Sequence, residues 1–273
     1  MFIKKDKYGV GTGRLRKLRV LSAIIVGCCV LFINTAGVAA NGSVHTESEK
    51  KPEPIAEGEV SAALLAEVGT GRVVYEYNSE EKLPAAGLTR LAALVSVCKG
   101  FDEGRLKPGD AVSVSEKAAG IGGTTAFLKA GEQMDAETML LAAVMINAGD
   151  ATHSLALAAA GSESAAVQEI NACMAGIGVE TNFSEICGAG EKLSASELAK
   201  IGAALTASES YRKFGTKFYE KIEHNTGAGA TELANPNKLV KQYSGCIGVG
   251  TGSSTEAGYC GVFAAKRGNT AFI

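Results

Sequence analysis

The chain has 273 residues, of which 46% are hydrophobic and 21% are charged. This length accommodates one large domain or two small ones, and the apolar content excludes general disorder. With 27 basic and 29 acidic residues there is no excess of positive charge, which argues against a nucleic-acid partner.

Residues 1–40 resemble an export signal. Seven basic residues precede or border an apolar run at 20–33, and the small residues at 38–40 suit cleavage. An uncleaved membrane anchor and a lipoprotein signal at Cys28 are the alternatives. We therefore expect an exported, extracytoplasmic protein, associated with the cell wall or the membrane, that contacts the membrane only through this segment.

The next residues predict a linker and then a hairpin. Residues 41–58 are polar and contain proline, which is typical of a linker, so the folded domain is expected at 59–273. Apolar stretches at 60–68 and 72–78 flank a glycine-bearing turn, which predicts two antiparallel strands.

Helices are predicted in the middle of the chain. Apolar or Ala- and Leu-rich segments favour helices at 88–98, 136–146, 151–160 and 164–177. Ser194, followed three residues later by Glu197, fits a capping box that begins a further helix. Strands are predicted again at 246–250 and 258–266. This order indicates an α+β fold, an antiparallel sheet flanked by helices with a helical subdomain inserted.

The cysteines and histidines give no sign of a metal or cofactor site. Five cysteines follow residue 40, an odd number that cannot pair completely, so buried free thiols are expected. A disulfide between Cys173 and Cys187 stays open. The histidines His45, His153 and His224 lack metal-ligand spacing, and we expect no metal and no cofactor.

One segment carries a resemblance to a known family. Residues 82–90 read Lys-Leu-Pro-Ala-Ala-Gly-Leu-Thr-Arg, which resembles the K-L-P-x-A-S-L-T-K segment around the nucleophile of serine D-Ala-D-Ala carboxypeptidases, the low-molecular-mass penicillin-binding proteins. Further matching blocks follow in order and cover nearly all of residues 59–267. The resemblance implies a β-lactamase-like or DD-peptidase-like fold and a place in peptidoglycan metabolism.

Active members of that family use the motifs S-x-x-K, S-x-N and K-T-G. The serine attacks the peptide carbonyl, the first lysine takes its proton, and the last motif binds the substrate carboxylate. In this chain the matching positions are Gly87 and Arg90, then Asn147 and Gly149, then Gly250 followed by the unchanged Thr251 and Gly252.

These substitutions predict loss of catalysis. Gly87 has no side chain to form an acyl-enzyme, and Arg90 stays protonated and cannot act as a base. Losing all members of such a cooperating set should abolish peptidase chemistry. We therefore expect a catalytically inactive homologue, retained to bind a peptidoglycan stem peptide or a cell-wall protein. The candidate binding groups are Arg90, Asn147 and the backbone of Thr251 and Gly252, by β-augmentation.

Several alternatives stay open. The chain could be an active serine-type carboxypeptidase with a non-standard nucleophile, although Thr89 and Ser96 are poorly placed for this role. The substituted glycines either fill space in an unused groove or line a groove retained for binding. For Arg90, we expect pairing with a local acid such as Asp150, and binding of a stem-peptide carboxylate is the alternative.

The carboxyl end raises one further expectation. Only six residues follow Lys266 and Arg267, fewer than in the resembled family, where a last strand and a closing helix are typical. Residues 271–273 could begin that strand. A truncated, non-functional product is the second alternative, and a sheet that lacks an edge strand would expose a pairing surface.

Overall fold

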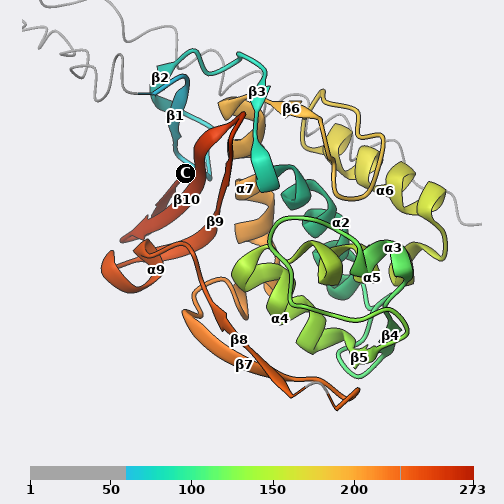
Figure 1. Cartoon of the computed structure of the whole chain (residues 1–273). Coiled ribbons are helices and arrows are strands. Elements are labelled where there is room, and N and C mark those ends of the chain that lie inside the picture. The colour runs from blue at the N-terminus through green and yellow to red at the C-terminus, as the bar shows by residue number, and fades with distance from the viewer. Residues whose placement is uncertain (1–59, 228) are drawn as a thin grey trace, which may run out of the picture. The chain divides into compact units, whose positions relative to one another are not determined.

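The computed structural model describes residues 60–227 and 229–273 (Figure 1). The predicted signal at 1–40 and linker at 41–58 therefore lie outside the described residues. Within the described ranges, no helix is both long enough and apolar enough to cross a membrane.

The central sheet is antiparallel, as predicted. Its first part is the hairpin of β1 (Ala63–Ala66) and β2 (Val73–Tyr77), and its second part comprises β9 (Cys246–Ser254), β10 (Gly258–Arg267) and β11 (Thr270–Phe272). Ala66 and Ile273 exchange backbone hydrogen bonds of 2.8 and 2.9 Å, which join the two parts in the order β2-β1-β11-β10-β9. The strand expected to begin at residues 271–273 is present as β11, which lies between β10 and β1.

Within the described residues, helices cover one face of this sheet and, with three short strand pairs, form the rest of the fold. They are η1 (Ala86–Thr89), α2 (Arg90–Asp102), α3 (Glu116–Ala119), α4 (Ala136–Ile146), α5 (Gly149–Ala160), α6 (Glu163–Gly176), α7 (Ala195–Ala207), α8 (Glu209–Arg212) and α9 (Leu239–Gln242). Figure 1 shows α7 against the sheet and α2 behind α7, with α3 to α6 farther away. The almost fully buried α2 packs on α5, α6 and α7, so it is the centre of the core.

The predicted helices are confirmed with small shifts. The segment predicted at 88–98 begins with the 3₁₀ turn η1 and continues to Asp102, while α4 has the predicted bounds. The short pairs β3 (Leu83–Pro84) with β6 (Lys192–Leu193) and β4 (Ala111–Ser113) with β5 (Gln133–Asp135) were not predicted. Nor was the hairpin of β7 (Tyr219–Glu223) and β8 (Ala230–Ala234). Strands of two or three residues are too short to show a period of two.

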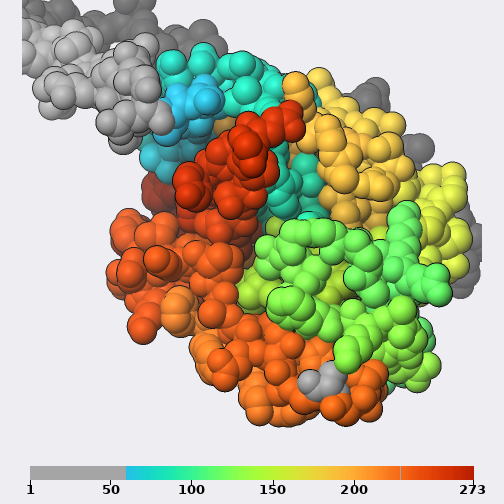
Figure 2. Space-filling view, viewed as in Figure 1, coloured from blue at the N-terminus to red at the C-terminus, as the bar shows by residue number. Residues whose placement is uncertain are grey.

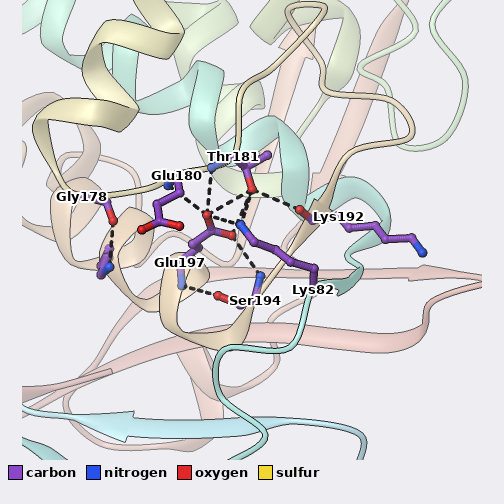
Figure 3. A network of polar contacts seen from close by, with 8 residues as sticks. Lys82, Gly178, Glu180, Thr181, Lys192, Ser194 and Glu197 are labelled. Atoms are coloured by element: carbon purple, nitrogen blue, oxygen red, sulfur yellow. Dashed lines mark hydrogen bonds and ion pairs between the residues drawn. The ribbon is translucent and has the colours of Figure 1, made fainter.

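A buried carboxylate fixes the loop between α6 and α7 (Figure 3). Glu197 Oε1 accepts hydrogen bonds from the backbone N–H groups of Glu180 and Thr181, both at 3.0 Å, and lies 2.5 Å from Lys82 Nζ. The predicted capping box is confirmed, because Ser194 N donates to Glu197 Oε2 and Ser194 Oγ accepts from Glu197 N, both at 3.1 Å. The network holds this loop against α7 and against the segment that precedes η1.

The same contacts set the charge state of Glu197. Burial alone would raise the pKa of Glu197, but hydrogen bonds from Lys82, Ser194 and Thr181 outweigh burial and lower it below its ordinary value. The carboxylate is therefore ionised at neutral pH and can accept all of these bonds.

All five described cysteines are free thiols, as expected. Cys98, Cys173 and Cys246 are buried, while Cys187 and Cys260 are partly buried. No disulfide joins Cys173 to Cys187.

Candidate functional site

The fold brings together the three segments that the sequence analysis matched to the family motifs. Gly87 lies in η1, Asn147 joins α4 to α5 in the left-handed conformation, and Gly252 lies on β9. Asn147 Nδ2 donates a hydrogen bond of 2.6 Å to the carbonyl of Gly87. A Cβ atom on Gly252 would lie 3.2 Å from Gly87 N, so β9 passes directly beside η1. Figure 2 shows the teal start of α2 recessed between the red β9–β10 hairpin and the gold loop before α7.

Arg90, the first residue of α2, is held by backbone carbonyls. Its guanidinium donates to the carbonyl oxygens of Thr124, Gly122 and Asn147 at 3.0, 2.7 and 3.2 Å. The expectation that Arg90 pairs with Asp150 is wrong, and no ion pair neutralises Arg90 within the described part of the chain. Its positive charge therefore stays uncompensated in a half-buried position.

Asp150 instead organises the loop that precedes β5. Its buried carboxylate accepts hydrogen bonds from the backbone N–H groups of Ala126, Leu128 and Ala151 at 2.9, 3.0 and 2.8 Å. Ala126 and Leu128 are buried on either side of Phe127, whose φ is 61° and whose side chain is 72% exposed. Arg90 and Asp150 thus hold the same loop, residues 122–128, against the site.

The substituted glycines differ in how much space surrounds them. A Cβ on Gly87 would have its nearest neighbour, Asn147 Nδ2, at 3.6 Å, and one on Gly250 would have its nearest at 3.8 Å, so both positions tolerate a side chain. A Cβ on Gly149 would lie 2.7 Å from Ile121 Cγ2 and 3.1 Å from Arg90 Cζ. A side chain at Gly149 therefore needs Ile121 and Arg90 to shift, whereas one at Gly87 or Gly250 does not.

A cavity of about 340 Å³ opens beside Gly87. Its polar lining comes from Arg90, Lys117, His153, Glu185 and Cys187, and its apolar lining includes Ile121 and Ile186. Lys117 pairs with Glu163 at 2.9 Å, and Glu185 Oε1 accepts from the N–H of Ala189 at 3.0 Å. The cavity thus has positive and negative groups on a mainly apolar wall.

Two side chains in this cavity carry a group that could act as a nucleophile, and neither is activated. The buried hydroxyl of Thr89 lies 3.0 Å from the carbonyl of Cys187 and 3.2 Å from that of Ala86. Burial raises the pKa of the Cys187 thiol to about 11, and the nearby positive charge of Arg90 offsets this only in part. A thiol in this state is protonated at neutral pH and is a poor nucleophile.

Sequence reasoning missed several residues of this cavity. His153 follows Gly149 by four residues on α5, a spacing that places both on one helix face, so a helical projection could have found it. Glu185 and Cys187 come from the loop held by Glu197 and carry no comparable signal. The positions of Thr251 and Gly252 on β9 beside η1 agree with the expected binding edge, and their binding role stays a prediction.

Comparisons with known proteins agree on one family. The family model described as D-alanyl-D-alanine carboxypeptidase matches residues 46–273. D-alanyl-D-alanine carboxypeptidase DacF of Bacillus subtilis is 32% identical over 255 residues, which are 92% of this chain and 64% of that protein. The chain thus spans less than two thirds of that relative.

Solved structures show the same fold. A variant of the Streptomyces K15 DD-transpeptidase has a TM-score of 0.69 at 22% identity, over 77% of this chain and 87% of that one. The D-alanyl-D-alanine carboxypeptidase DacD from Francisella tularensis has a TM-score of 0.70 at 20% identity, over 86% and 70%.

Proposed function

This chain belongs to the D-alanyl-D-alanine carboxypeptidase family, and we propose that it is an inactive member that binds peptidoglycan stem peptides outside the cytoplasm. The observation that carries the proposal is Gly87. The position of the nucleophile has no side chain although its neighbours leave room for one, while an open cavity persists beside it.

The loss of chemistry follows from three positions together. Gly87 offers no nucleophile, Arg90 cannot accept a proton, and Gly250 offers no ammonium group for a substrate carboxylate. The thiol of Cys187 and the hydroxyl of Thr89 are not activated. Among the described residues that line the cavity, no activated hydroxyl or thiol supplies the nucleophile that acyl transfer needs.

Two features support binding. The strand β9 is the last in the sheet order and hydrogen-bonds only to β10 among the named strands, so its other edge can pair with an extended peptide beside Thr251 and Gly252. Arg90 carries a charge that no carboxylate of the described residues neutralises, and a peptide carboxylate is its natural complement.

The test combines covalent labelling with binding. The purified protein is incubated with a fluorescent penicillin, beside a restored variant that carries Gly87→Ser, Arg90→Lys, Asn147→Ser, Gly149→Asn and Gly250→Lys. We expect labelling of the restored variant only. Calorimetric titration with a synthetic peptide ending in D-Ala-D-Ala should show binding, and the same peptide with an amidated carboxyl end should bind at least about tenfold more weakly.

Both the labelling and the peptide titration have an outcome that would contradict the proposal. Labelling of the natural protein would show an active enzyme with a non-standard nucleophile, which mass spectrometry of the adduct would locate. Equal affinity for the free and the amidated peptide would show that the peptide carboxylate does not contribute to binding. Absence of peptide binding in a folded protein would leave a cell-wall protein as the expected partner.

A further inference from the structure

His153 is a buried histidine that the family motifs do not use. It lies on α5, is 1% exposed and lines the cavity beside Gly87. Nδ1 has no hydrogen-bond partner among the described residues. Nε2 lies 2.9 Å from Glu163 Oε1, within ion-pair distance, so a carboxylate already faces this nitrogen.

A buried imidazole with an unpaired nitrogen is uncommon and calls for an explanation. Burial lowers the pKa of His153 below its ordinary value, and the charge of Glu163 opposes this shift only in part. The ring is therefore neutral at neutral pH, with one N–H donor and one acceptor nitrogen. A polar ligand in the cavity would satisfy the nitrogen that the protein leaves unpaired.

The charges around the cavity restrict the class of ligand. Arg90 presents a positive charge without a carboxylate partner among the described residues, and Glu185, from the loop between α6 and α7, presents a carboxylate. Lys117 also lines the cavity, but its charge is paired with Glu163. A ligand with only a negative charge would be repelled by Glu185, and a ligand with only a positive charge would be repelled by Arg90. A metal ion is not indicated either, because no three His, Cys, Asp or Glu side chains cluster suitably within residues 60–227 and 229–273.

We propose that this cavity binds a small amino-acid zwitterion, with its carboxylate toward Arg90 and its ammonium group toward Glu185 and His153. The ammonium has three N–H donors, enough for the Glu185 carboxylate and the acceptor nitrogen of His153 together. A volume of about 340 Å³ lies at the small end of ligand pockets. This site goes beyond the proposed binding of a stem peptide along β9.

The full chain is titrated with D-alanine and L-alanine, and separately with propionate and ethylamine, which each lack one of the two charged groups. Binding is followed by calorimetry and by the NMR signals of the histidine ring protons. We expect at least one alanine enantiomer to bind and to shift the His153 signals, and both single-charge compounds to bind at least about tenfold more weakly.

Variants connect binding to the named groups. His153→Leu should weaken alanine binding at least about tenfold, and His153→Gln should recover part of the affinity because its amide keeps a hydrogen-bonding group. Glu185→Gln should weaken alanine but not propionate. The matched control Glu209→Gln, an exposed glutamate on α8, should change neither. Circular dichroism confirms that each variant is folded.

Results that contradict the zwitterion site can be told apart from results that contradict the proposed function. Equal affinity for propionate and alanine would show a site for anions. Unchanged affinity for alanine in the folded His153→Leu variant would show that His153 does not contribute to alanine binding. Either result, or no binding of alanine, overturns the zwitterion site while leaving stem-peptide binding intact. A chain that binds alanine but not the D-Ala-D-Ala peptide would instead overturn the proposed function alone.

Discussion

The guanidinium of Arg90 occupies the space that a side chain on Gly149 would need. A Cβ at Gly149 would lie 3.1 Å from Arg90 Cζ, and 2.7 Å from Ile121 Cγ2. Arg90 and Gly149 are therefore linked by packing, and a larger residue at either position constrains the other.

This link predicts a coupling between mutations. Gly149→Ala should lower the free energy of unfolding by about 2 kcal/mol, because the added methyl overpacks against Arg90 and Ile121. In the Arg90→Ala background the added cost should fall by about 1 kcal/mol, since one of the two neighbours is gone. Urea unfolding of the natural protein, the two single variants and the double variant measures this coupling energy.

A matched control separates crowding from helix propensity. Gly176 is the last residue of α6, and a Cβ added there would meet no atom within 4 Å, so Gly176→Ala should be neutral or stabilising. Additive effects of Gly149→Ala and Arg90→Ala would contradict the packing link.

Gly87→Ser alone should be tolerated without restoring chemistry. The nearest neighbour of its Cβ would be at 3.6 Å, so stability should change by less than about 0.5 kcal/mol. The hydroxyl would have no base, because Arg90 stays protonated, and fluorescent penicillin should not label the variant. Stoichiometric labelling of this single variant would show that another group serves as the base.

Asp150→Ala should release the loop of residues 122–128. The substitution removes the acceptor for three backbone N–H groups, and we expect the free energy of unfolding to fall by about 2 kcal/mol. Hydrogen exchange at Ala126 and Leu128 should become faster. Asp110→Ala, which removes one exposed bond to the N–H of Lys107, is the control and should have a smaller effect. Unchanged exchange at residues 126–128 would mean that other contacts hold the loop.

Glu197 should make stability depend on pH. The folded state lowers the pKa of Glu197 below its ordinary value of 4.5, so its contribution is complete above that value and is lost as the pH falls through the lowered one. Glu197→Gln should lower the free energy of unfolding at pH 7 by about 2 kcal/mol and flatten this acid dependence. Urea unfolding at a series of pH values between about pH 3 and pH 7 tests both effects. If the free energy of unfolding falls as steeply with pH in the variant, groups other than Glu197 cause the acid dependence.

Cys187 should react slowly with alkylating reagents. Burial raises its pKa from 9.0 to about 11, so at pH 8 the thiolate fraction should be about 100-fold lower than for an ordinary thiol. Iodoacetamide labelling of the folded protein, followed by peptide mapping, measures the rate at this site, which should rise with pH up to about 11. Rapid labelling of Cys187 at pH 7 would reveal an activated thiol and support the active-enzyme alternative.

Much of the fold and part of the site were predictable from local patterns. The bounds of α4, the capping box at Ser194 and the hairpin β1–β2 follow from periodicity and turn chemistry, which neighbouring residues determine. The match of Gly87, Gly149 and Gly250 to the family motifs also came from local spacing of residue types, and it stays a prediction. That Gly87 offers no side-chain nucleophile needs no coordinates, since glycine has no side chain in any conformation.

Only the tertiary structure decided which groups meet. Asp150 was expected to pair with Arg90 but binds backbone N–H groups of a loop more than twenty residues earlier, while Arg90 takes carbonyls from the same loop. Likewise, the cavity combines His153 from α5 with Glu185 and Cys187 from a loop positioned by Glu197. Local sequence determines the chemistry of each residue and the type of each element. The hydrogen-bond and ion-pair partners of a charged side chain depend on long-range packing, because backbone groups and other side chains are alternative partners for it.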